Sequence, residues 1–208
     1  MDADFSVELG HDDPVLDFPW TDPAGKLAYL DVKRHPELLS QIEEAERFPE
    51  LRDFLRSVNS PRSAIETAKC DAWASTELTL EEEIYDASHK FASYVDIVFS
   101  THSESPSPHQ PPPDRPRLDR QSLSDHQQFA TNLVSLLRRA PETPSPVEIC
   151  IRRCYFAELG GVRDGFYCTV YVSGYGSDEA SARQAWGVGL KLTGNAILQI
   201  SATSRGRS

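Results

Sequence analysis

The sequence has no long hydrophobic run, and its mean hydropathy is -0.45. Charged side chains interrupt its short apolar stretches, so no segment is suited to cross a membrane. The first ten residues lack the basic start and apolar stretch of a secretory signal. We therefore predict a soluble protein that acts in the cytoplasm and has no membrane partner.

Motifs for catalysis and for cofactors are also missing. The chain has no glycine-rich phosphate loop, dinucleotide fingerprint, nucleophile elbow or zinc-protease motif. We expect no cofactor and favour a protein that is not an enzyme. His11, Asp12, Asp13 and Asp17 lie close together, but acidic segments flanked by proline are usually solvated loops. We therefore predict no metal site.

Cysteine is scarce, with only Cys70, Cys150, Cys154 and Cys168. A secreted disulfide scaffold is shorter and denser in cysteine. Cys150 and Cys154 have a spacing that resembles a metal motif, but on a strand they lie about 13 Å apart, too far to share one zinc ion. The sequence therefore predicts buried, reduced thiols.

Acidic side chains outnumber basic ones, and the net charge is -11. The excess lies in residues 1–100, which carry a net charge of -13, whereas residues 101–208 carry +2. A net acidic chain repels a phosphate backbone, so nucleic acid is not an expected partner. The partners left open are a second copy of the chain, another protein or a small ligand.

Hydrophobic periodicity predicts an alternation of helices and strands. We expect helices after Pro36 and Pro49, strands near 65–74 and 91–99, a helix from Ser124, and strands near 147–156 and 166–175. Six prolines between Pro106 and Pro116, in two PxxP patterns, indicate a flexible linker over 101–121 rather than a docking motif.

These elements predict the α+β class. We expect an antiparallel sheet of four or more strands, with helices packed mainly on one face and the order α-β-β-linker-α-β-β-α. The whole of 1–208 then forms a single domain from two α-β-β halves, about 26–100 and 122–203, joined by the linker.

Residues 178–200 allow two interpretations. Gly194 and Asn195 resemble a two-residue hairpin turn. The helical alternative places an apolar stripe on one face, and we prefer it because periodicity is the stronger signal. The stripe consists of Trp186, Leu190, Thr193, Ile197 and Ile200.

The hairpin over 147–175 offers a candidate ligand site. We predict the register in which Cys154 lies opposite Cys168 and Phe156 opposite Phe166, because it keeps apolar residues together. One face then holds a possible platform for a planar or anionic ligand, although tyrosines also bury their rings under a helix or a partner. The platform consists of Arg153, Tyr155, Tyr167 and Tyr171.

A second candidate site lies between the two halves. Two strand carboxylates there are candidates for acid–base work, although strand charges more often pair with a basic residue across the sheet. The residues of this alternative cleft are Asp71, His89, Asp96 and Arg152. The sequence thus favours a non-catalytic module for self-association or for binding a small ligand or protein, with an enzyme of scattered residues as the alternative.

Overall fold

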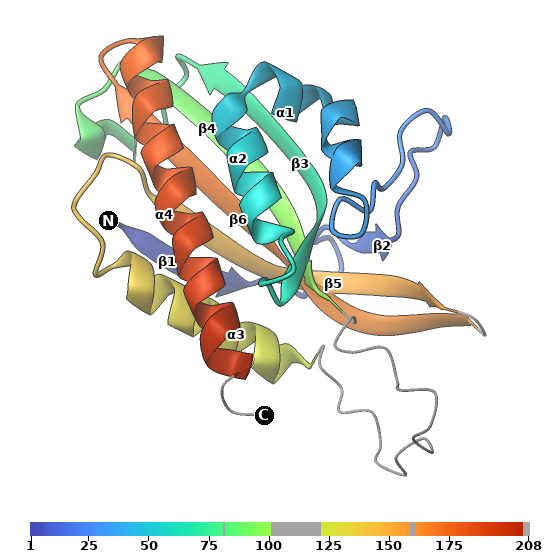
Figure 1. Ribbon diagram of the computed structural model, residues 1–208. Coiled ribbons are helices and arrows are strands. Elements are labelled where there is room, and N and C mark those ends of the chain that lie inside the picture. Colours follow the sequence, from blue (N-terminus) through green and yellow to red (C-terminus); the bar gives the residue numbers. More distant parts are fainter. Residues whose placement is uncertain (81, 101–121, 159–160, 206–208) are drawn as a thin grey trace.

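The computed structural model describes residues 1–80, 82–100, 122–158 and 161–205. Strands and helices alternate along the chain from the first residues onward (Figure 1). The strands are β1 (Ala3–Val7), β2 (Leu16–Phe18), β3 (Ile65–Ser75), β4 (His89–Phe99), β5 (Val147–Glu158) and β6 (Gly161–Gly176). The helices are η1 (Pro36–Gln41), α1 (Glu43–Arg47), α2 (Pro49–Val58), η2 (Glu82–Tyr85), α3 (Leu123–Leu137) and α4 (Glu179–Arg205), of which η1 and η2 are 3-10 helices.

All six strands form one mixed sheet in the order β1-β5-β6-β4-β3, with β2 also paired to β5. The pairs β3–β4, β4–β6 and β5–β6 are antiparallel. The two N-terminal strands run parallel to β5, β1 beside Val147–Ile151 and β2 beside Cys154–Phe156. The strands of the two predicted halves thus meet in one sheet, through β4 and β6.

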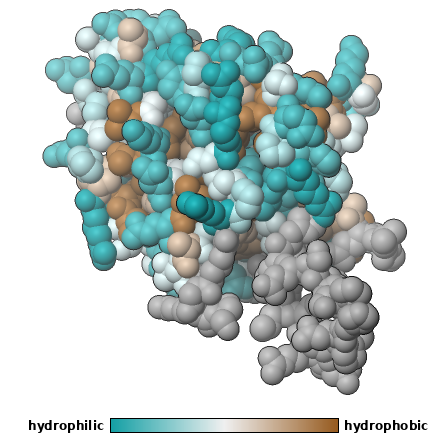
Figure 2. All heavy atoms as spheres, in the orientation of Figure 1, coloured by the Kyte–Doolittle hydropathy of each residue, from teal (hydrophilic) through white to brown (hydrophobic). Residues whose placement is uncertain are grey.

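Helices α2, α3 and α4 lie on one face of this sheet (Figure 1). Pro49 occupies the first turn of α2, and Ser122 caps α3 by accepting a hydrogen bond from the Asp125 N–H at 3.2 Å. Between these helices and the sheet lies the main core, which includes Leu51, Phe91 and Ile149. The outer surface of the helices is mostly hydrophilic (Figure 2).

Helix α4 confirms the helical interpretation of residues 178–200. Its Trp186, Leu190 and Ile197 are at most 1% exposed and face the core. The helix lies almost against the backbone of β6, because a Cβ atom at Gly174 would lie 2.2 Å from the Trp186 nitrogen. Glycine at this position allows the close approach.

The α+β class is confirmed, but the prediction of a purely antiparallel sheet is wrong. Strands β1 and β2 are parallel to β5, and the order of elements begins with these two strands rather than with a helix. Both strands are short, and their partner β5 lies about 140 residues later in the chain. Local periodicity therefore does not indicate the pairing. The predicted linker 101–121 lies outside the described residues.

The predicted register of the β5–β6 hairpin is also wrong. Cys154 lies opposite Gly165, and Cys168 lies opposite Ile151. The two cysteines therefore point to opposite faces, Cys168 into the main core and Cys154 into a smaller cluster. The β-branched Ile149 and Ile151 supply the main-core positions of β5, whereas Cys154 and Phe156 point to the other side of the sheet.

The second face of the sheet is covered in a different way. Near the ends of β5 and β6, the segment with Leu16, Phe18 and Trp20 packs on Cys154, Phe156 and Tyr167. At the opposite end, Tyr85 of η2 stacks on Tyr175, with ring centroids 4.3 Å apart. Within the described residues, no helix is long and apolar enough to span a membrane.

Candidate functional site

The stretch of sheet between these two covers is called the open face below. It lies opposite α2, α3 and α4, and no helix in the described part of the chain packs on it. Residues in register across a sheet point to the same side. One such row runs over four strands and consists of Asp71, Tyr94, Tyr171 and Glu148. Two tyrosines therefore stand between two carboxylates, and both carboxylate residues are exposed.

Aromatic rings form a chain along this row. The Trp73 and Tyr94 ring centroids are 6.5 Å apart, and those of Tyr94 and Tyr171 are 6.3 Å apart, with an interplanar angle of 54° in both pairs. Trp73 is 40% exposed, whereas both tyrosines are half-buried. Isolated exposed apolar residues are common, but a tryptophan beside two tyrosines on an uncovered face is typical of a binding surface.

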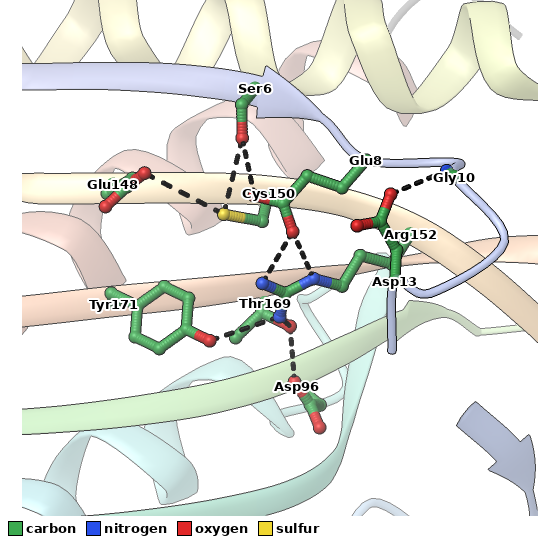
Figure 3. Close-up of polar contacts among 10 residues, drawn as sticks. All are labelled: Ser6, Glu8, Gly10, Asp13, Asp96, Glu148, Cys150, Arg152, Thr169 and Tyr171. Carbon is green, nitrogen blue, oxygen red and sulfur yellow. Dashed lines mark hydrogen bonds and ion pairs between the residues drawn. The ribbon is translucent and has the colours of Figure 1, made fainter. Parts of the chain in front are cut away.

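Arg152 forms the centre of a polar network beside the aromatic row (Figure 3). Its Nε and Nη2 atoms each lie 2.7 Å from Oε2 of Glu8. Its Nη1 donates to the Thr169 hydroxyl at 3.0 Å and to the Tyr171 hydroxyl at 3.1 Å. Thr169 in turn donates to Oδ1 of Asp96 at 2.7 Å. The guanidinium is therefore largely occupied within the protein.

Burial and charge set the pKa values in this network. Burial raises the pKa of Asp96 to about 6, although the Thr169 hydrogen bond and the charges of Lys69 and Arg152 oppose it. Burial also acts to raise the pKa of Glu8, but the hydrogen bond from Arg152 and weaker interactions outweigh it, so the value lies below the usual range. Glu8 thus stays ionised at neutral pH, whereas Asp96 titrates near the physiological range.

The thiol on this face is not arranged as a nucleophile. Cys150 is 2% exposed, and its Sγ atom lies 3.4 Å from the Ser6 hydroxyl, which donates to it (Figure 3). Burial raises the pKa of Cys150 to about 11, so the thiol is protonated at neutral pH. Within the described ranges, no group of three histidine, cysteine or acidic side chains gathers as metal ligands would.

The four residues of the predicted platform do not share a face. Tyr167 and Tyr171 lie on the same side of the sheet as Arg152, because Tyr167 is directly opposite Arg152. Arg153 and Tyr155 alternate with Arg152 and therefore point to the other side, near the projecting end of the hairpin. Tyr167 is only 3% exposed. The structure thus retains Tyr171 as a surface residue and separates it from Arg153 and Tyr155.

The alternative residues are brought together in part. Asp96 and Arg152 are linked through Thr169, and Asp71 lies on the same face in register with Tyr94. His89 is at the far end of β4, opposite Gly176, and its ring contacts the Ser88 hydroxyl. Because β4 pairs directly with β6, these residues lie on a continuous sheet and not on the two walls of a cleft.

Sequence reasoning missed Trp73, Glu8 and Thr169. One signal was available for Trp73, because Lys69, Asp71 and Trp73 alternate along β3 and so share a face. Nothing local indicates Glu8, which reaches Arg152 only through the parallel pairing of β1 with β5.

The chain was compared with protein-family models, with curated proteins and with solved structures, and none of the three comparisons finds a match.

Proposed function

We propose that this protein is a non-catalytic binding module and that the open face is the surface that binds a partner protein. The observation that carries the proposal is the exposed ring of Trp73 beside Tyr94 and Tyr171 on that face. Tryptophan and tyrosine contribute most to binding when they leave water at the centre of an interface. The four cysteines fit a module of the cytoplasm, because no two of them lie opposite each other in the sheet register.

The polar groups of the open face support binding more than catalysis. A catalytic side chain needs an atom that is free to contact the substrate. The guanidinium of Arg152 already contacts Glu8, Thr169 and Tyr171. Asp96 is 7% exposed and accepts the Thr169 hydroxyl. Both side chains therefore serve to hold strands β1, β5, β6 and β4 together.

One observation favours a second candidate, an enzyme that uses Asp96 as a general acid–base. The pKa of Asp96, about 6, lies in the range that such a group needs at neutral pH. The two candidate functions depend on different side chains. An enzyme depends on Asp96 and a bound small molecule, whereas a binding module depends on the exposed aromatic ring.

The test uses two side chains of nearly equal exposure on opposite sides of the molecule. Trp73 is 40% exposed on the open face, and Val188 is 42% exposed on α4. A photo-reactive amino acid is placed at 73 or at 188 in the full chain, and proteins cross-linked in cells are identified and purified. Binding of a purified candidate partner is then measured with Trp73→Ala and Val188→Ala.

We expect a cross-linked partner from position 73 only, and a loss of affinity of about tenfold or more for Trp73→Ala. Val188→Ala should bind as the unmodified protein does. Equal affinity of Trp73→Ala and the unmodified protein for every candidate partner would overturn the proposal. A partner captured only from position 188 would place the binding surface on the helices instead.

A further inference from the structure

We propose that the open face recognises a positively charged side chain of the partner, a lysine or an arginine, at Trp73, Tyr94 and Asp71. This inference rests on the proposed function and specifies the chemistry of the partner. The two rings come from adjacent strands, and Asp71 is in register with Tyr94 and two residues before Trp73 on the same face. A cation beside them meets two aromatic π-systems and a carboxylate.

The open face and its borders already hold cations of the protein in this manner. The Arg152 guanidinium lies 5.7 Å from the centroid of the Tyr171 ring, and the Lys69 ammonium lies 5.4 Å from that of Trp20. Within the described part of the chain, Trp73 and Tyr94 have no cation over their rings. Aromatic faces attract cations through the ring quadrupole, so these two rings offer the same interaction to a partner.

Asp71 supplies the charge that such a cation needs. Its side chain is exposed, and its Oδ1 atom accepts the N–H of Ala72 at 2.7 Å. No described residue donates a hydrogen bond to its Oδ2 atom. Lys69, the neighbouring base on β3, has its ammonium over the Trp20 ring and lies in register with Asp96.

The wider charge distribution selects the same class of partner. Glu148 closes the other end of the tyrosine row, and residues 1–100 carry a net charge of -13. Such a surface attracts a basic segment from a distance and repels phosphate groups. A second copy of this chain carries -11 and is repelled as well, so the occupant that fits is a basic segment of a different protein.

The experiment titrates the full chain with three probes: hexa-arginine, its neutral isostere hexa-citrulline, and hexa-glutamate. Binding is followed by the NMR signals of the three indole N–H groups. The Trp20 indole donates to the Ala68 carbonyl and the Trp186 indole to the Ser93 hydroxyl, whereas Trp73 is exposed. We expect hexa-arginine to shift the Trp73 signal, with weaker binding at higher salt, and we expect no shift from the other two peptides.

Matched variants separate recognition from general charge attraction. Affinities of the variants are measured by calorimetry, because Trp73→Ala removes the responding indole signal. Trp73→Ala should weaken hexa-arginine binding about fivefold and Asp71→Asn about threefold. Glu142→Gln removes one exposed acid from the loop after α3 and serves as the charge control for Asp71→Asn.

Three results would overturn the inference: no shift at Trp73, equal binding of hexa-citrulline, or equal losses for Asp71→Asn and Glu142→Gln. Its failure is distinguishable from that of the proposed function. If Trp73→Ala abolishes binding to the cross-linked partner while hexa-arginine leaves Trp73 unchanged, the open face binds its partner by other chemistry. If neither experiment responds to Trp73, both proposals fail.

Discussion

Arg152 stabilises the molecule through three acceptors, Glu8 directly after β1 and both Thr169 and Tyr171 on β6. Its side chain is 11% exposed, and the Glu8 side chain that pairs with it is 31% exposed. Partial burial strengthens the pair, but it also means that the loss of one member leaves the other charge without a partner. The network therefore matters for folding even though it is not proposed to act on a substrate.

Replacing Arg152 by methionine should lower the free energy of unfolding by about 2 kcal/mol, because Glu8 loses its charged donor. The double variant Glu8→Gln with Arg152→Met should lose less unfolding free energy than Arg152→Met alone, because it has no unpaired carboxylate. Urea unfolding with an unchanged slope measures both. If the double variant loses as much unfolding free energy as Arg152→Met and Glu8→Gln lose separately, added together, the two residues act independently.

Asp96 should make stability depend on pH in the direction opposite to that of most carboxylates. Its pKa is about 6 in the folded protein against 3.8 for the ordinary side chain. The folded state therefore holds this proton more tightly than the unfolded state. Below about pH 4, Asp96 is protonated in both states and does not change the free energy of unfolding. As the pH rises to about 6, ionisation of Asp96 lowers this free energy progressively, by on the order of 3 kcal/mol.

The matching variant is Asp96→Asn, which stays neutral. The difference in unfolding free energy between Asp96→Asn and the unmodified protein should grow in favour of the variant from pH 4 to pH 7. Urea titrations at intervals over this range measure it, and other titrating groups cancel in the difference. A difference that is constant over the range would contradict the raised pKa.

At the scale of elements, α4 packs closely on the backbone of β6. A Cβ atom at Gly174 would lie 2.3 Å from the Ala182 carbonyl oxygen, as well as 2.2 Å from the Trp186 nitrogen. Both are backbone atoms, which cannot turn aside as a flexible side chain does. The distance between the helix and the sheet is thus fixed by glycine on the strand.

Gly174→Ala should therefore lower the free energy of unfolding by about 3 kcal/mol, because the helix must move away from the sheet. Gly187→Ala is the matched control, since its new methyl would meet only the flexible Glu50 side chain, at 3.1 Å. The control should be neutral or slightly stabilising, because alanine favours a helix. Thermal unfolding of both variants tests this, and equal stability would show that α4 adjusts freely.

Elements with a strong local period were predictable from the sequence, and pairing between distant elements was not. Helix α2 begins at Pro49 and buries Leu51, Phe54, Leu55 and Val58 as its spacing predicts. The β5–β6 register was not predictable, because both sides of β5 carry apolar residues, Ile149 and Ile151 on one and Cys150 and Cys154 on the other. That register decides which tyrosine meets Arg152, so the candidate site could be predicted only in part.

At the scale of the whole molecule, the two predicted halves interlock. The β5–β6 hairpin of the second half lies between β4 of the first half on one side and β1, which precedes both halves, on the other. The α2–α4 contact adds the Glu50–Arg183 ion pair, whose Arg183 Nη2 lies 2.8 Å from Oε2 of Glu50. Neither half can complete the sheet alone.

A protease site introduced between residues 101 and 121 should therefore cut the chain without separating it. The two fragments should elute together from a sizing column in native buffer and apart in urea. The uncut protein provides the reference position. Two folded fragments that elute separately in native buffer would contradict the interlocked sheet.

The parallel pairing of β1 with β5 has a consequence for how the chain reaches its fold. The partners of Ala3–Val7 are Val147–Ile151, so β1 has no neighbour in the sheet until β5 has left the ribosome. Contacts of such long sequence separation slow folding, because the loop between them closes at an entropic cost. The hairpin of β3 and β4 is available much earlier as a local nucleus. We therefore expect the N-terminal strand to join the sheet only after β5 has been synthesised, well after the β3–β4 hairpin has formed.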